Sequence, residues 1–139
     1  MSLEVFMLQK LLTFLMLIAL ALPVTAQQSG TDQIDYVELT EPFTTNYMGG
    51  DGRLHFLQIQ VTLMTRGEIA RQTVYDNKPL VRNQLAFFLF GQSEDVLRQS
   101  GSKEILRKQA LAEVRQLLTK ETGLAYGVEE ILFTRFIIQ

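Results

Sequence analysis

The chain has 139 residues, a formal net charge of −2 and a hydrophobic fraction of 47%, values typical of one folded domain rather than a disordered chain. It contains no Cys, which excludes disulfides, zinc-thiolate sites and thiol nucleophiles, and its single His excludes a multi-histidine metal site within one chain. No run of Lys or Arg occurs, so the sequence predicts no nucleic-acid partner.

The first 26 residues have the features of an export segment. Lys10 precedes an apolar run from Leu11 to Leu22, and a small-x-small cleavage motif ends at Ala26. We therefore predict a signal peptide that is cleaved after Ala26. The first alternative is an uncleaved, single-pass membrane anchor: the run alone would reach about 18 Å as a helix, but residues 5–26 would reach about 33 Å, enough for a hydrocarbon core of roughly 30 Å. The second alternative is a buried soluble helix.

A polar linker is predicted over residues 27–33, and the folded domain is expected over 34–139. Ile34–Leu39 has the composition of a short strand, which Pro42 should interrupt before Phe43–Tyr47 resumes it. Gly49-Gly50-Asp51-Gly52 is the strongest turn signal in the chain and predicts a hairpin.

The second strand of that hairpin is predicted over Leu54–Thr65, because its side chains alternate with a period of two. One face is apolar and consists of Leu57, Ile59, Val61 and Leu63. The other face is mostly polar and consists of Phe56, Gln58, Gln60, Thr62 and Met64. This pattern is typical of a strand that is buried on one side only.

Helices are predicted in the middle of the chain. Gly67–Asn77 is expected to be helical, with Ile69, Thr73 and Val74 on one side. Pro79 should then open a second helix, because proline favours the first helical turn. The body of this helix, Leu80–Phe90, contains Phe87, Phe88 and Phe90, which cannot share one stripe at 100° per residue. Either the helix is buried on more than one side within the domain, or one side packs against another subunit.

A third, long helix is predicted over Ser102–Thr122, closed by Gly123 and preceded by a helical turn at Glu94–Gln99. Its apolar residues fall within one arc of about 140°: Leu106, Ala110, Leu111, Val114, Leu117 and Leu118. Arg107 falls inside this arc. Its guanidinium should therefore be satisfied by a group of the same chain or face a partner.

Val128–Gln139 ends the sequence as a strand rich in β-branched and aromatic residues. Strict alternation places Ile131 and Phe133 on one face and Phe136 and Ile138 on the other, so both faces are apolar. We expect helices to cover one face, and either the Phe43–Thr65 hairpin or a neighbouring subunit to cover the other. The element order predicts an α+β fold, a small antiparallel-rich sheet with helices on one face.

The sequence offers no catalytic constellation. His55 could act as a general base, but no nucleophile motif accompanies it. The adjacent acids Glu94-Asp95 and Glu129-Glu130 should point in different directions, and Gly49–Gly52 lacks the Lys-Ser/Thr ending of a phosphate-binding loop. We therefore predict no catalytic residue, cofactor or metal, and a protein that is not an enzyme.

Several segments, in order, resemble one family. The ending Phe133-Thr134-Arg135-Phe136-Ile137-Ile138-Gln139 resembles the terminal strand of the FliL family of flagellar basal-body-associated proteins. Pro79-Leu80-Val81-Arg82-Asn83 resembles the start of a family helix, and Gly101 with Leu106-Arg107 resembles the opening of its long helix. Together with similar entry strands, the resemblance covers about residues 36–139.

The resemblance implies a stomatin-like (SPFH) domain on the periplasmic side of the bacterial inner membrane, at the flagellar basal body. It implies a homo-oligomeric ring near the stator proteins MotA and MotB, which supports torque, swimming and swarming, and it implies no enzyme activity. We expect Arg82, Phe87, Phe88, Phe90 and Arg107 to contribute to an oligomer or partner interface. Family members usually have a longer cytoplasmic start, so this chain could instead be a FliL-like paralogue.

A periplasmic small-ligand or protein-binding module, unrelated to the motor, is the alternative function. A concave apolar pocket lined by Phe87, Phe88 or Phe90 would favour it.

Overall fold

The structure is a computed structural model that describes residues 3, 5, 7, 33–123 and 127–139. The predicted export segment, with Lys10, Leu11, Leu22 and Ala26, lies outside the described residues, as does the linker up to residue 32. Among the described residues we find no helix with the length and apolar content that a membrane crossing requires.

The predicted hairpin is present and consists of β1 (Ile34–Met48) and β2 (Leu54–Arg66). Its turn uses Gly52 at a φ of 76°, a conformation that favours glycine, and the Asp51 carboxylate accepts a hydrogen bond of 3.0 Å from the main-chain N–H of Arg53. The predicted interruption at Pro42 takes the form of a shift in register between Leu39 and Phe43, within one continuous strand.

The third strand, β3 (Val128–Ile138), pairs antiparallel with β2, so β2 is the central strand of a sheet with the order β1-β2-β3. The predicted apolar face of β2 is confirmed: four side chains of alternate residues are buried, namely Leu57, Ile59, Val61 and Leu63. These side chains form the centre of the hydrophobic core.

Strict alternation along β3, predicted from the sequence, is wrong. The register against β2 shifts twice, which leaves Glu129 and Thr134 without a directly opposed residue on β2. Each extra residue reverses the alternation. As a result Ile131 and Phe133 face the same side as Phe136 and Ile138, and all four pack on the core. One face of β3 therefore meets the helices, and a second apolar cover is not needed.

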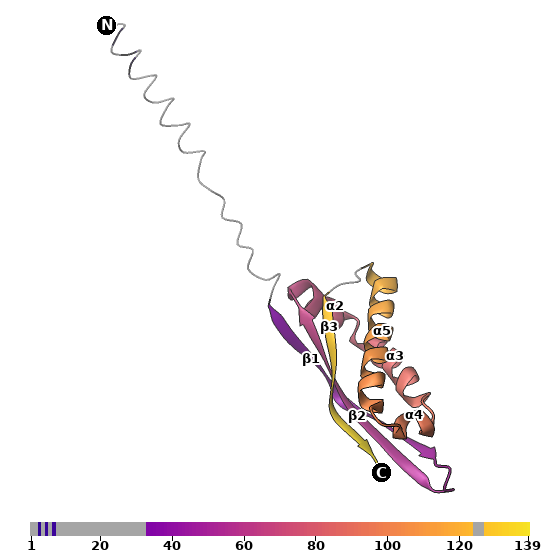
Figure 1. Cartoon of the computed structure of the whole chain (residues 1–139). Helices are drawn as coiled ribbons and strands as arrows, with labels where there is room; N and C mark the ends of the chain where they lie inside the picture. The colour runs from indigo at the N-terminus through magenta and orange to yellow at the C-terminus, as the bar shows by residue number, and fades with distance from the viewer. Residues whose placement is uncertain (1–2, 4, 6, 8–32, 124–126) are drawn as a thin grey trace.

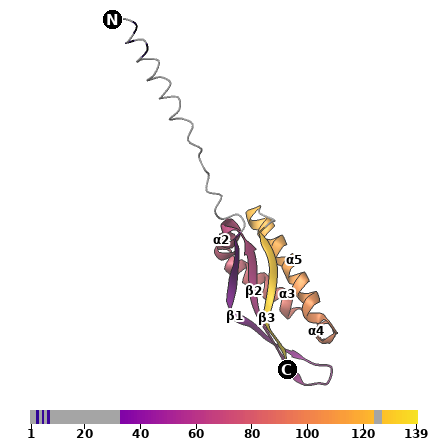
Figure 2. The same cartoon turned by 60° about the vertical axis from the view of Figure 1, so that its left-hand side comes forward.

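Four helices lie on one face of the sheet (Figure 1 and Figure 2). Their bounds are α2 (Glu68–Asp76), α3 (Lys78–Phe90), α4 (Glu94–Arg98) and α5 (Ser102–Thr122). Helix α3 packs over β1, helix α5 packs over β3, and the two helices contact each other. This arrangement confirms the predicted α+β fold. The similarity to the stomatin fold stays a prediction.

Helix α5 matches its prediction closely. It ends at Gly123, whose φ of 74° and N–H bond of 2.9 Å to the carbonyl of Thr119 form the expected left-handed cap. The predicted arc is buried, apart from the partly buried Leu117. Helix α2 differs, since it buries Ala70 and Val74 but leaves Ile69 69% exposed.

The sheet face away from the helices, here named the open face, carries a mixture of polar and apolar side chains. Its members include Tyr36, Glu38, Thr44, Phe56, Gln58, Leu132 and Ile137. Half-exposed apolar groups at this face alternate with amides and hydroxyls, which lets an uncovered sheet meet water.

Candidate functional site

Helix α3 presents an apolar row to solvent. Val81, Leu85 and Leu89 are fully buried and form its core stripe. The opposite side of the helix carries the α3 crest, which we define as Leu80, Phe87 and Phe90, with exposed fractions of 45%, 72% and 43%. Since Leu80 and Phe87 are seven residues apart, they lie on the same side of the helix, two turns from each other. The crest is an apolar surface without a cover from the described residues.

The three phenylalanines of α3 have three different environments. Phe88 is partly buried and packs against the core. Phe90 meets the ring of Phe43 on β1 edge to face, with ring centres 6.5 Å apart, although part of its surface is exposed. Phe87 is open to solvent. The prediction that this helix is buried on more than one side is therefore wrong within the chain, and packing against another subunit remains the open alternative.

Arg82 connects α3 to the register shift of β1. Its Nη1 donates a hydrogen bond of 2.6 Å to the main-chain carbonyl of Glu41, and its Nη2 lies 3.5 Å from the Glu41 carboxylate. The guanidinium also lies over the ring of Phe43, 4.7 Å from its centre. Arg82 thus holds the irregular part of β1 against α3 through Glu41 and Phe43.

The guanidinium of Arg107 makes its polar contacts within the chain, which is the first of the two predicted alternatives. It donates to both carboxylate oxygens of Glu104 at 2.8 Å, forms an ion pair with Glu130 on β3, and donates to the carbonyl of Ile131 at 3.3 Å. The guanidinium lowers the pKa of Glu104 to about 2. Arg107 therefore joins α5 to β3 and does not require a partner.

Arg115, whose helical projection lies outside the predicted apolar arc of α5, has a similar position. Its Nε donates to the carbonyl of Val128 at 2.9 Å, and its Nη2 donates to the carbonyl of Glu129 at 3.0 Å. Arg107 and Arg115 lie eight residues apart and so project from the same side of the helix. Between them they occupy carbonyl groups at the start of β3, a strand at the edge of the sheet.

A second group of polar side chains surrounds His55 at the tip of the hairpin. His55 lies beside Asp51 of the turn, Arg98 of α4 and the main chain of Gln139. Glu94 of α4 accepts a hydrogen bond of 2.6 Å from the N–H of Gly50. That N–H and Arg98 hold the pKa of Glu94 below its usual value. The sequence reasoning singled out His55 and Glu94 separately and did not place them together.

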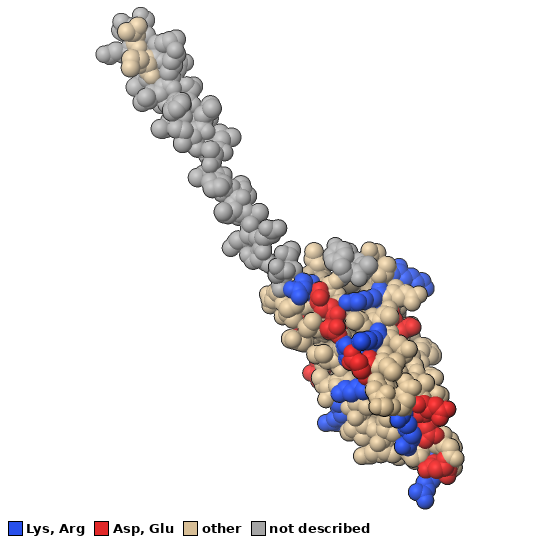
Figure 3. Space-filling model, in the orientation of Figure 1, with Lys and Arg blue, Asp and Glu red and all other residues tan. Residues whose placement is uncertain are grey.

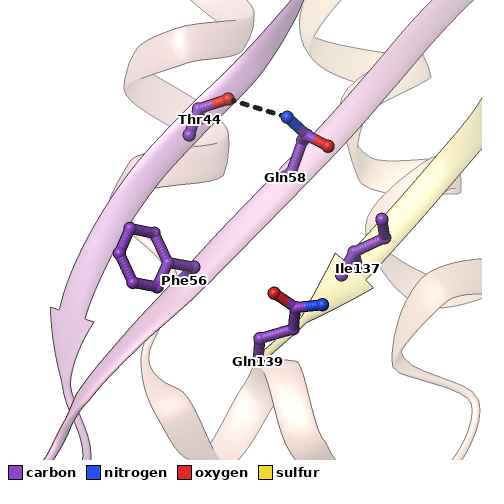
Figure 4. Close-up of a pocket in the computed structure, with 5 residues that line it drawn as sticks. All are labelled: Thr44, Phe56, Gln58, Ile137 and Gln139. Carbon is purple, nitrogen blue, oxygen red and sulfur yellow. Dashed lines mark hydrogen bonds between the residues drawn. The ribbon is translucent and has the colours of Figure 1, made fainter.

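A shallow groove of about 210 Å³ lies on the open face, close to the hairpin tip (Figure 4). All three strands contribute to its lining: Thr44, Phe56, Gln58, Ile137 and Gln139. None of these side chains is charged. Phe87, Phe88 and Phe90 do not line this groove, so it is not the aromatic helix pocket that the ligand-binding alternative predicts.

Two further observations describe the chemistry of the surface. Within residues 33–123 and 127–139, no three His, Asp or Glu side chains come together in a way suited to a metal ion. The face shown in Figure 3 has Lys and Arg interspersed with Asp and Glu. Charges of both signs therefore lie close together on this face (Figure 3).

The fold and these surfaces define an α+β domain with an exposed apolar row on helix α3. A comparison with protein-family models matches residues 36–139 to the family described as flagellar basal body-associated protein FliL. Since the match spans most of the chain, this protein belongs to the FliL family. The family is one of structural flagellar proteins associated with the basal body. A search of curated proteins found no match.

Proposed function

We propose that this protein is a non-enzymatic component of the flagellar motor that works beside the stator units, on the periplasmic side of the inner membrane. It supports motor torque and, through it, swimming and swarming. Family membership supports the basal-body association. The proposal adds a homo-oligomer of the domain and contact with the stator proteins MotA and MotB.

The observation that carries the proposal is the exposure of the α3 crest. Phe87 is 72% exposed, although burying a side chain of this size is worth about 1.5–3 kcal/mol. Aromatic residues at such positions commonly supply a large part of the affinity of an interface. We therefore assign the crest to contact with a second protein chain, either a neighbouring copy or a stator protein.

Arg82 and Arg107 have a positioning role in this proposal. Arg82 fixes α3 on β1, and Arg107 fixes α5 on β3. Both guanidinium groups are engaged within the chain, so they hold the contact surface in place while the crest makes the contact.

Motility assays test the proposal. The variant Phe87→Ser removes the most exposed ring of the crest, and Ile69→Ser is its matched control, because Ile69 on α2 is exposed to a similar extent. We expect Phe87→Ser to reduce spreading in soft agar and in viscous medium towards that of a gene deletion, while Ile69→Ser spreads as the wild type does. Equal spreading of both variants would contradict the role of the crest.

Photo-crosslinking identifies the partner. A photoreactive amino acid at position 87 should give an adduct with a second copy or with a stator protein, and the same amino acid at position 69 should give neither. Circular dichroism confirms that both serine variants keep the fold, so that a loss of motility reports the contact. Normal motility of the gene deletion on both media would overturn the motor function itself.

A further inference from the structure

His55 occupies a prepared position at the hairpin tip. It is the single histidine of the chain, and its side chain is only 14% exposed. Its ring stacks on that of Tyr47, with centres 5.5 Å apart and an interplanar angle of 22°. A Cβ atom at Gly49 would come within 2.5 Å of the imidazole, so glycine makes room for the ring. The stacking and the close main chain fix the direction of both ring nitrogens.

One ring nitrogen has a partner that suits either protonation state. Nε2 lies 3.0 and 3.2 Å from the two carboxylate oxygens of Asp51. The N–H of Arg53 and the imidazole both lower the pKa of Asp51, so this carboxylate stays ionised to a lower pH than is usual for aspartate. An ionised carboxylate only accepts hydrogen bonds, and it therefore keeps a proton on Nε2.

The other ring nitrogen has two partners that exclude each other. Nδ1 lies 3.2 Å from the main-chain oxygen of Gln139, which can only accept, and 3.1 Å from Nη2 of Arg98, which can only donate. With a proton, Nδ1 can donate to Gln139 but cannot accept from Arg98. Without a proton, it can accept from Arg98 but has nothing to donate to Gln139.

We propose that His55 is a proton-dependent switch: the neutral ring binds Arg98 on α4, and the protonated ring binds Gln139 after the end of β3. Histidine is the side chain whose ordinary pKa places this change between pH 5 and 8. The proposal does not depend on the partner contact assigned to α3. Under this proposal, His55 at the hairpin tip contacts Arg98 on α4, and the contact strengthens as the pH rises and the ring loses its proton.

The remaining groups around the ring stay constant over this range. Asp51 and Glu94 both have lowered pKa values, and the pKa of Arg98 is raised by Glu94. Tyr47 contributes an aromatic face from β1. When the ring gains its positive charge, Arg98 is repelled from Nδ1 and keeps its bond of 2.8 Å to Glu94. The protonation of His55 alone therefore changes the contacts of the cluster.

Nitrogen-15 NMR of the imidazole tests the proposal, because a single histidine gives a single set of ring signals. Above the titration midpoint we expect the Nε2–H tautomer, with Nδ1 unprotonated. The amide signals of α4 and of residues 56 and 139 should move with the same midpoint. A neutral ring protonated on Nδ1, or α4 amides that ignore the titration, would overturn the switch.

Two variants, whose fold is to be checked by circular dichroism, give a second readout. Arg98→Met removes a positive charge beside the ring and should raise the midpoint of the NMR titration above that of the wild type. Arg71→Met is its control, since it removes the same charge from an exposed pair with Glu68 on α2. Equal midpoints for the two variants would also overturn the proposal.

Discussion

Arg107 joins two segments that are 23 residues apart, by binding Glu130 and the carbonyl of Ile131 from a side chain that is only 19% exposed. Arg107→Met keeps the apolar stem but leaves both β3 groups without their donor. We expect the free energy of unfolding to fall by about 1–3 kcal/mol at pH 7, measured by urea denaturation. In Arg71→Met, which breaks the exposed pair with Glu68, it should be nearly unchanged.

The same variant should show a defined dependence on pH. Arg107 lowers the pKa of Glu104 from 4.5 to about 2. A depressed pKa contributes stability that is complete above the unfolded value and is lost as the pH falls through the folded one. The difference between wild type and Arg107→Met should therefore shrink between about pH 4.5 and pH 2. A difference that stays constant across this window would show that Glu104 does not contribute.

Individual residues also mark where sequence reasoning stops. The position of Arg107 within an apolar arc predicted a contact either within the chain or with a partner, and the structure shows ion pairs with Glu104 and Glu130. Arg115 gave no such signal, because its projection lies outside the arc and its partners are main-chain carbonyls. The His55 cluster was equally hidden, since its members come from different elements that meet only in the fold.

At the scale of the element, the bulge at Thr134 decides which face of β3 carries the large side chains. Removing Thr134 alone would leave Phe136 opposite Ile59, on the core face, because Thr134 is the unpaired residue of the bulge. Removing both Thr134 and Arg135 should instead turn Phe136 and Ile138 towards the open face. We expect this double deletion to cost about 2–4 kcal/mol of unfolding free energy, because two core side chains are uncovered. Thr134→Ala keeps the chain length and should change stability little. A double deletion as stable as Thr134→Ala would contradict the assigned register.

Elements differ in how far their sequence determines them. Helix α5 was predictable to its last residue, because its apolar arc and Gly123 are both local signals. The buried face of β2 was predictable for the same reason. The bulges of β3 were not, since a bulge is a relation between two strands that lie about 70 residues apart in the sequence.

At the scale of the whole molecule, the sequence of residues 1–26 predicts export of the domain. We expect the protein recovered from the periplasmic fraction to begin at Gln27, as cleavage after Ala26 requires. Mass spectrometry of membrane and periplasmic fractions measures this directly. An intact start at Met1 in the membrane fraction would instead support a single-pass anchor.

The central position of β2 has a consequence for the order of folding. The β1–β2 hairpin closes through a short turn and can form as soon as residue 66 is available. The other edge of β2 pairs with β3, the last strand in chain order. Until β3 pairs with β2, that edge and the neighbouring core face stay exposed. Exposed strand edges and apolar surfaces favour aggregation. A partly synthesised chain therefore exposes an unpaired strand edge, which is paired only once β3 is present.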